Sequence, residues 1–372
     1  MIQFLCNRQD LLEAVQTCKR AVSTRSSSPL LEGVLIEAAQ ELTLFGYDQK
    51  LGIETRCAAD IQQQGRLVVE PDILESILKK LPDGAIHFEE RENCLVKLSC
   101  QQVVFEIHGL DAEGYPLLPR IEEGQQQELL MAQKDLRKMI ASTRDCISRD
   151  VNRPNLTGAL FKAQGHRAEM VAIDGYRMAI YRVDKAAEDQ PWGEYAFIIP
   201  GSTLSELYQA LKDKGELRIL ADSTHIEFRY GETRMISNLV AGAFMEYEKF
   251  FPKSYQTAMT IDSRALRSAL ERALILTNSD EIRFPLNLEM KDEQYLHVRI
   301  NTVKGGFKDQ IELESAEGPN IKLDFNPFFF QEVVRVLDDE KVRLEFSGSI
   351  GPCVVSPLEG DRYSYLMLPL RG

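Results

Sequence analysis

The chain lacks the features that would place it in or across a membrane. No apolar run approaches the roughly 18 residues that a membrane-spanning helix needs. The first ten residues have neither the basic start nor the apolar core of a secretory signal. The seven cysteines are odd in number, and no two of them form a Cys-x-x-Cys pair. We therefore expect a cytoplasmic protein with reduced cysteines, without disulfides or zinc.

Sequence motifs that carry catalysis are also missing. There is no phosphate-binding glycine loop, no Gly-x-Ser-x-Gly elbow and no His-Glu-x-x-His motif. The five histidines are scattered without metal-ligand spacing. Adjacent acids such as Glu89 and Glu90 make poor acid–base pairs, because neighbours on a strand point to opposite faces. We expect no catalytic residue, no metal and no cofactor, while an active site assembled between distant segments stays open as an alternative.

What the chain does have is a long internal period. Amphipathic helices with basic residues on the outer face are predicted at 7–23, 132–148 and 262–277, so their starts lie 125 and 130 residues apart. A period of this length is typical of a repeated domain rather than of a solenoid unit. The sequence predicts three domains, and their ranges are 1–125, 126–253 and 254–372.

A second helix recurs in the same register, which makes the duplication more than one coincidence. It is predicted at 70–81, 200–211 and 326–337, each time after an apolar strand and before a short turn and another strand. Between the helices, short segments alternate apolar and polar residues, which is typical of antiparallel sheets with one wet face. We predict an α+β fold of three repeated domains, each an antiparallel sheet plus two helices.

Charge is distributed unevenly along the chain. The net charge is −13, yet segments 7–23, 134–149 and 263–272 carry net charges of +1, +3 and +2. The first helices are thus positive on an otherwise acidic protein, and distribution matters more than the sum for binding nucleic acid. An ordinary solvated helix face would explain each helix taken alone.

Two segments are unusual for other reasons. The Asp-Gly pair at 174–175 predicts a tight turn flanked by Tyr176 and Arg177. The chain end at 365–372 is apolar, whereas chain ends are usually polar and frayed. Such an end is either a strand that completes a sheet or a surface suited to binding peptides.

These segments carry a family resemblance. Residues 172–179, 365–372, 244–253 and 25–31 resemble motifs of the bacterial DNA polymerase III β subunit, the β sliding clamps, and together with the threefold period they make the resemblance specific. The resemblance covers essentially the whole chain. It implies the DNA clamp fold, with six domains of a head-to-tail homodimer forming a ring and helices lining the central hole. It also implies a processivity factor that encircles double-stranded DNA in DNA replication and is opened by a clamp loader.

The resemblance assigns basic residues to the DNA. Arg25 matches a DNA-contacting arginine of the family, and Gly201 and Ser202 stand where the family often carries basic residues. The other candidates were chosen for basic character on or near the first helices: Lys19, Arg20, Arg137, Lys138, Arg144, Arg149, Arg153, Arg264, Arg267 and Arg272.

The resemblance also implies a hydrophobic groove for the glutamine-led peptides of replicative and repair polymerases and of the clamp loader. Its family threonine, histidine, leucine, proline and valine are replaced here by Ile173, Tyr176, Met178, Met245 and Phe250, so we expect an apolar groove of altered shape. The matching residues are Leu156, Ile173, Gly175, Tyr176, Arg177, Met178, Met245, Lys249, Phe250, Asn326, Phe329, Ile350, Pro352, Leu366, Met367, Leu368, Pro369, Leu370 and Arg371.

The family's dimer contact joins the first domain of one chain to the third domain of the other. Phe105, Ile275 and Leu276 match its apolar core, although ordinary core residues would look the same. Two alternatives stay open beside the clamp. One is a paralogous ring or scaffold that binds peptides without encircling DNA, and the other is an enzyme with a site between repeats.

Overall fold

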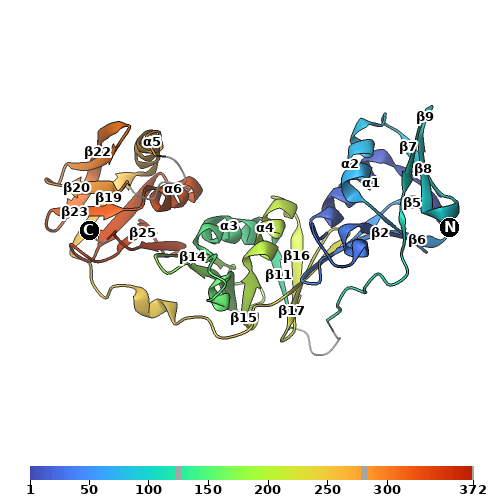
Figure 1. The fold of residues 1–372 in the computed structure, drawn as a ribbon. Coiled ribbons are helices and arrows are strands. Elements are labelled where there is room, and N and C mark those ends of the chain that lie inside the picture. The colour runs from blue at the N-terminus through green and yellow to red at the C-terminus, as the bar shows by residue number, and fades with distance from the viewer. Residues whose placement is uncertain (122–126, 278–283, 371–372) are drawn as a thin grey trace. The chain divides into compact units, whose positions relative to one another are not determined.

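The computed structural model describes residues 1–121, 127–277 and 284–370. These form two compact units, Met1–Lys134 with Gln209–Leu239, and Asp135–Tyr208 with Val240–Gly372 (Figure 1). Each unit holds one end repeat together with part of the middle one. The prediction of three repeated domains of antiparallel sheet plus two helices is confirmed, since the same order of strands and helices returns three times along the chain.

The first repeat contains helices α1 (Arg8–Lys19) and α2 (Pro71–Lys80), which pack side by side. Its strands are β1 (Gln3–Asn7), β2 (Val34–Ala38), β3 (Leu42–Tyr47), β4 (Leu51–Cys57), β5 (Ala59–Gln63), β6 (Gly65–Val69), β7 (Ala85–Glu90), β8 (Leu95–Cys100), β9 (Val103–His108) and β10 (Leu110–Asp111). The Asn7 side chain caps α1 by accepting a hydrogen bond from the Gln9 amide at 2.8 Å, which satisfies one of the unpaired donors of the first turn.

The middle repeat contains helices α3 (Gln133–Thr143) and α4 (Gly201–Ala210). A short 3₁₀ turn, Arg144–Cys146, follows α3, so the predicted helix at 132–148 ends early. The strands are β11 (Gln127–Ala132), β12 (Gly158–Gly165), β13 (Arg167–Ile173), β14 (Arg177–Asp184), β15 (Trp192–Pro200), β16 (Glu216–Ala221), β17 (His225–Tyr230) and β18 (Thr233–Asn238).

The third repeat contains helices α5 (Ser263–Leu274) and α6 (Pro327–Val336), again side by side. The Asp262 and Asn326 side chains cap them by accepting bonds from the amides of Ala265 and Phe328. The strands are β19 (Thr257–Asp262), β20 (Leu286–Met290), β21 (Tyr295–Thr302), β22 (Gly305–Glu317), β23 (Ile321–Phe325), β24 (Lys341–Phe346), β25 (Cys353–Pro357) and β26 (Tyr363–Met367).

Sheets run on from one repeat into the next. In the first unit a nine-stranded sheet has the order β10-β6-β2-β3-β4-β18-β17-β16-β11, so the antiparallel pair β4–β18 joins the first repeat to the middle one. In the second unit a twelve-stranded sheet begins β15-β12-β13-β14-β26-β25-β24-β19-β22, and β14–β26 joins the middle repeat to the third. Each junction therefore rests on a ladder of backbone hydrogen bonds.

Several described strands end a sheet and are paired on one side only, and two unpaired edges lie on strands that the internal repeat relates to the junctions described above. β9 pairs only with β8, at the end of the five-stranded sheet β5-β1-β7-β8-β9. The first part of β22, residues 305–312, pairs with β21 on one side, and only the later residues of β22 pair with β19. Exposed edges of this kind are templates for pairing with another chain.

The linker after the first repeat covers the first junction. Leu118 lies over Gly52 of β4, where an added Cβ would stand 2.9 Å from its side chain, and beside Ile236 of β18. Arg234 fixes this linker by donating to the Pro119 carbonyl at 3.1 Å. Gly52 lies five residues after Tyr47, its partner across the β3–β4 hairpin, and Met178 lies five residues after Ile173, its partner across the β13–β14 hairpin. Met178 is therefore the residue of the second junction that corresponds to Gly52.

Candidate functional site

Several basic residues of the first helices are used within the repeat. Arg267 on α5 donates to the carbonyls of Val334 and Leu337 at the end of α6, at 2.7 and 2.9 Å. Arg137 on α3 donates to the Tyr208 carbonyl on α4 at 3.3 Å. The last carbonyls of a helix are unpaired and carry partial negative charge, so a cation there stabilises the helix pair.

Other candidates are neutralised by nearby acids. Lys19 at the end of α1 pairs with Asp72 and, at 2.7 Å, with Glu75 on α2. Lys138 pairs with Asp338, and Arg272 pairs with Asp309. Pairing leaves each of these cations less positive potential to offer a distant phosphate. The basic residues of these helices therefore differ in how much positive charge they can offer to a ligand.

Three arginines remain exposed without an ion pair to another described residue: Arg25 after α1, Arg149 after the 3₁₀ turn, and Arg264 in the first turn of α5. Arg144 stacks over the ring of Tyr208 at 4.1 Å and keeps its charge. These four arginines are the candidates whose positive charge stays available. Arg20 donates to the Gln209 amide oxygen at 2.7 Å.

The Glu75 carboxylate lies at the centre of the α1–α2 contact. It accepts from Lys19 and Gln16 and pairs with Lys79 at 2.5 Å, while its side chain is only 13% exposed. The bond from Lys19, followed by those from Lys79 and Gln16, lowers the pKa of Glu75 to about 2. This carboxylate therefore stays charged and holds the two helices together over the ordinary pH range.

A separate apolar surface is centred on the β14–β26 junction, and we call it the apolar patch. Its floor is a cluster of buried side chains from both repeats, with Val240, Phe244, Phe251 and Tyr255 packed against it. The floor contains the predicted groove residues Leu156, Ile173, Met178 and Leu366, so strands from two repeats bring these four together. Ile173, Met178 and Leu366 share one sheet face because they are direct partners across neighbouring strands, and Leu156 joins them from the 3₁₀ turn Pro154–Leu156.

Exposed apolar side chains surround this floor. Tyr176 is 67% exposed, Phe250 47%, Leu368 41% and Met245 39%. The Leu368 amide donates to the Tyr176 carbonyl at 2.9 Å, which holds the chain end beside the Asp-Gly turn. That turn needs its glycine, since Gly175 has φ +98°, in the left-handed region. The patch therefore presents large apolar groups on a fixed backbone.

The remaining predicted groove residues lie toward the end of the chain or on the linker. Leu370 is tied by its amide to the Asp324 carbonyl at 2.7 Å, and Lys249 is exposed and pairs with Glu246. Ile350 is almost fully exposed, while Pro352 and Pro369 are half-buried. Arg371 lies outside the described residues.

Four predicted groove residues are wholly or partly buried, and their role in a groove stays a prediction: Arg177, Phe329, Met367 and Asn326. Arg177 lies on the opposite face of β14 from Met178, buried between Asp174 and Glu332 and over the ring of Phe329 at 4.1 Å. Met367 is 1% exposed and alternates with Leu366 on β26. Asn326 is buried as the cap of α6. A motif match fixes the position of a residue but not the face that it occupies.

Arg153 was expected at the DNA, but the structure places it at the apolar patch. A Cβ added to Gly175 would stand 3.4 Å from the Arg153 guanidinium, and the side chain is 61% exposed with Asp150 at 3.7 Å. The sequence could not separate this arginine from Arg149, four residues earlier, because a turn lies between them, closed by the Arg153 amide, which donates to the Asp150 carbonyl at 3.0 Å.

The unpaired edges carry the predicted dimer residues. Phe105 on β9 is 37% exposed, its neighbour Val104 is 51% exposed, and Ile275 after α5 is 78% exposed, while Leu276 is half-buried. Helix α5 packs on β22, where the half-buried Phe307 stands in the unpaired part of the strand. Sequence analysis missed Val104 and Phe307, although the apolar start of β9 was the available signal.

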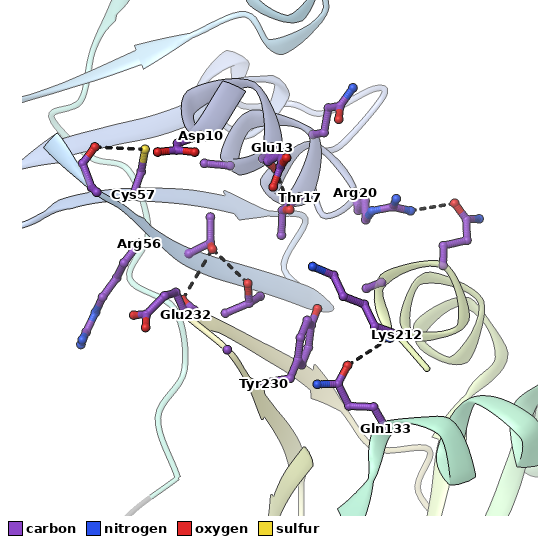
Figure 2. A pocket seen from close by; sticks show the side chains of 18 residues that line it. Asp10, Glu13, Thr17, Arg20, Arg56, Cys57, Gln133, Lys212, Tyr230 and Glu232 are labelled. Atoms are coloured by element: carbon purple, nitrogen blue, oxygen red, sulfur yellow. Dashed lines mark hydrogen bonds between the residues drawn. The ribbon is translucent and has the colours of Figure 1, made fainter. Parts of the chain in front are cut away.

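A polar hollow of about 520 Å³ in the first unit is lined by α1, β4, the β17–β18 turn and the end of α4 (Figure 2). No histidine is among its lining residues, and its one thiol, Cys57, donates to the neighbouring Ala58 carbonyl at 3.8 Å. Tyr230, Lys212 and Gln133 face it from the opposite side. In the described part of the chain, no group of three or more metal-binding side chains comes together. This arrangement favours no particular reaction.

None of the helices in the described ranges is both long and apolar enough to cross a bilayer.

The described features define a protein of three α+β repeats with basic helices, one apolar patch and two unpaired strand edges. Family models for the DNA polymerase III beta subunit match in order, the N-terminal domain at 2–119, the central domain at 130–246 and the C-terminal domain at 248–371. The chain therefore belongs to the DNA polymerase III beta subunit family.

Individual relatives agree along their whole length. The beta sliding clamps of Staphylococcus epidermidis and Halalkalibacterium halodurans are 27% and 28% identical, with each chain covered completely. A putative DNA polymerase III beta subunit from Eubacterium rectale superposes with a TM-score of 0.93 at 27% identity over both whole chains. A Pseudomonas aeruginosa sliding clamp bound to griselimycin gives 0.89 at 26%, also over both whole chains.

The Glu75 contact predicts a pH-dependent stability. Glu75→Gln should lower the melting temperature at neutral pH by a few degrees, corresponding to about 1 kcal/mol because water screens the partly exposed lysines. A lowered carboxyl pKa stabilises the fold above the ordinary value of 4.5, and this contribution is lost as pH falls toward about 2.

The melting temperatures of parent and variant, measured by calorimetry from about pH 7 to about pH 3, should therefore converge. Asp72→Asn, at an exposed partner of Lys19, is the control and should change little. A gap that stays constant down to the lowest pH would contradict the assignment.

Proposed function

We propose that this protein is a DNA sliding clamp. Two copies associate head to tail into a ring that encircles duplex DNA without reading its sequence, and the ring tethers DNA polymerases and repair proteins. It acts in the cytoplasm and catalyses no reaction of its own. The observation that carries this proposal is the pair of unpaired strand edges on a chain whose other repeat junctions are continuous sheet.

The internal repeat predicts how the ring closes. β4 and β14 follow the central hairpin of their repeats, and each pairs with the last strand of the next repeat, β18 or β26. The corresponding strand of the third repeat is β22, and the last long strand of the first repeat is β9, since β10 has only two residues and pairs with β6. The third junction therefore pairs β22 of one chain with β9 of the partner, and two such contacts close a dimer.

The same comparison gives the register. At the two internal junctions, Gly52 opposes Ile236 and Met178 opposes Leu366. Gly52 and Met178 each lie five residues after the residue that they face across their own hairpin. Ile236 and Leu366 are each the fourth residue of their strand. In the third repeat the equivalent residue is Gly306, which pairs with Asn301 across its hairpin.

The fourth residue of β9 is Glu106, so Gly306 opposes Glu106 of the partner subunit. Antiparallel pairing then sets Phe307 against Phe105 of the partner subunit, and Lys308 against Val104 of the partner subunit. Two aromatic side chains opposite each other would bury the exposed edge.

The DNA contacts follow from the charges that remain available. Arg25, Arg149 and Arg264 are exposed and lie on or beside the first helix of each repeat, and Arg144, stacked over Tyr208, adds further positive charge. Phosphate contacts of this kind position DNA without sequence information, and their strength falls with salt. Lys19, Lys138, Arg267 and Arg272 act mainly in helix packing.

The apolar patch is the docking surface for partner peptides. Its exposed side chains surround a floor shared by two repeats, and Arg153 and Lys249 supply positive charge nearby. Apolar walls with a few polar groups suit a short hydrophobic peptide. The occupants are the clamp-binding motifs of replicative and repair polymerases and of the clamp loader.

The alternative of a peptide-binding scaffold that does not encircle DNA has one observation in its favour. Several cations of the first helices are paired with acids or helix ends, which weakens the positive surface. A topological test separates the two functions, because an encircling ring holds DNA even when phosphate contacts are screened.

A cysteine pair tests the predicted register. Val104→Cys combined with Lys308→Cys should give a disulfide-linked dimer on mild oxidation, because opposed Cβ atoms lie about 4.5–5.5 Å apart, close to what a disulfide bridges. Denaturing gels without reductant provide the measurement. Val104→Cys with Gln310→Cys, on the same face but two residues out of register, should cross-link far less. Equal cross-linking of both would contradict the register.

The covalently closed dimer then tests encirclement. Oxidised in the presence of circular DNA, it should stay with the DNA through a wash in about 1 M salt, which screens phosphate contacts. Cutting the circle with a restriction enzyme should release it, as measured by gel filtration. Loss from the uncut circle, or retention after cutting, would sink the proposal that the ring encloses DNA.

Removing exposed side chains tests the patch. Phe250→Ala with Leu368→Ala should weaken binding of a fluorescent peptide Gln-Leu-Ser-Leu-Phe at least about tenfold, since buried aromatic and aliphatic anchors dominate such contacts. Both residues are partly exposed, so the fold should persist. Leu110→Ala, at a similarly exposed leucine of β10, is the control. Unchanged peptide affinity in fluorescence anisotropy would refute this placement.

A further inference from the structure

The segment that carries Met245 and Phe250 at the apolar patch is fixed to the sheet through one side chain. Tyr247 begins the 3₁₀ turn Tyr247–Phe250 and is 3% exposed. Its ring belongs to the buried floor of the patch and meets the ring of Phe244 edge-on, with centroids 6.4 Å apart. Met245 lies two residues before Tyr247 and Phe250 lies three residues after it. The position of Tyr247 therefore determines where Met245 and Phe250 lie.

A row of charged residues lies beneath the Tyr247 hydroxyl. Lys162 on β12, Glu169 on β13 and Arg182 on β14 are directly paired across three neighbouring strands. They share the sheet face of the patch floor, because they lie two residues from Leu160, Val171 and Ile180 on those strands. The apolar floor therefore gives way to a polar row at one end, and Tyr247 spans the boundary.

The hydroxyl makes two polar contacts to this row. It donates to the Glu169 carboxylate and accepts from the Lys162 ammonium at 3.2 Å. The carboxylate also pairs with Lys162 at 3.4 Å and with Arg182 at 3.3 Å, so it is held in place from both sides. Hydrogen bonds to ionised partners are stronger and more directional than neutral ones.

Burial, followed by the bond to Glu169, raises the pKa of Tyr247. The hydroxyl therefore keeps its proton at ordinary pH and remains a donor to the carboxylate.

The network extends to the third repeat. Arg182 donates to the Asp361 carbonyl at 2.7 Å, and Arg167 binds both Asp184 and Asp361 through its guanidinium. Asp361 lies two residues before β26, the strand that carries Leu366 at the floor of the patch. The same row of charges thus touches both the linker and the strand that border the patch.

We propose that Tyr247 is a positioning residue for peptide binding: held by Glu169 and Lys162, it fixes segment 244–251 so that Met245 and Phe250 stand ready at the patch. The proposal rests on the peptide-docking function proposed above. It adds that affinity depends on a residue whose polar contacts are all to the sheet below. The ordering of this segment is then complete before a peptide arrives, which lowers the entropy cost of binding.

The first linker offers an internal comparison. Tyr115 lies in the linker after the first repeat, is also buried, and donates to the Phe45 carbonyl at 3.5 Å. This acceptor is a neutral backbone group rather than a carboxylate, and the Tyr115 linker covers the β4–β18 junction. Tyr115→Phe therefore removes the same hydroxyl from an equivalent linker without touching the apolar patch.

The experiment measures peptide affinity and local hydrogen exchange on the full chain. Tyr247→Phe keeps the ring in the floor and removes the hydroxyl. We expect the affinity for the peptide Gln-Leu-Ser-Leu-Phe to fall about tenfold, as loss of one charge-assisted bond predicts. We also expect amide exchange to accelerate in 244–251 but not in β12–β14. Tyr115→Phe should leave both readouts unchanged.

A second variant keeps the test independent of folding defects. Glu169→Gln retains an acceptor for the hydroxyl but loses the charge, so we expect a smaller loss of affinity. Its effect should not add to that of Tyr247→Phe, because both act through one bond. Affinity within twofold of the parent for Tyr247→Phe, or additive effects in the double variant, would overturn the proposal. Failure of the parent itself to bind the peptide would instead overturn the docking function.

Discussion

Antiparallel backbone pairing across repeat boundaries is the constraint on which the rest of this structure depends. The β4–β18 and β14–β26 ladders make each boundary part of a sheet, so neighbouring repeats cannot move apart without breaking several hydrogen bonds together. They also create the apolar patch, whose floor draws side chains from both sides of one ladder. A chain of three repeats has two such boundaries, which leaves one strand edge at each end to be satisfied from outside.

Several charged residues of the first helices stabilise the packing of helices within a repeat. Arg137 and Arg267 occupy the ends of neighbouring helices, and Lys19 joins α1 to α2 through Glu75. A helix C-terminus and a carboxylate a few ångströms away outweigh a phosphate that is separated by solvent, because Coulomb interactions weaken with distance and screening. These helices are rich in basic residues, but only some of those residues are exposed without an acidic partner among the described residues.

Periodicity predicted the fold well, since helices, strands and their threefold order all follow from local patterns of apolar and polar residues. The candidate site was predicted less completely. Leu156, Ile173 and Met178 come together as expected, but Arg177 and Met367 occupy the other strand face, and Arg153 lies beside Gly175. Strand phase and loop reversals decide these placements. Tyr247 lies in the recognised segment 244–253, but its contact with the charged row carried no sequence signal, because cross-strand pairs lie far apart along the chain.

The two junctions differ at one position of their hairpins, Gly52 in the first and Met178 in the second. Glycine leaves room that Leu118 of the chain's own linker fills, whereas methionine fills that room itself and Phe250 stays partly exposed. The linker therefore covers the β4–β18 junction, whereas the apolar patch at the β14–β26 junction stays exposed. The apolar patch lies at one of the two described junctions, so under the docking function proposed above, partner proteins compete for that one position on each subunit.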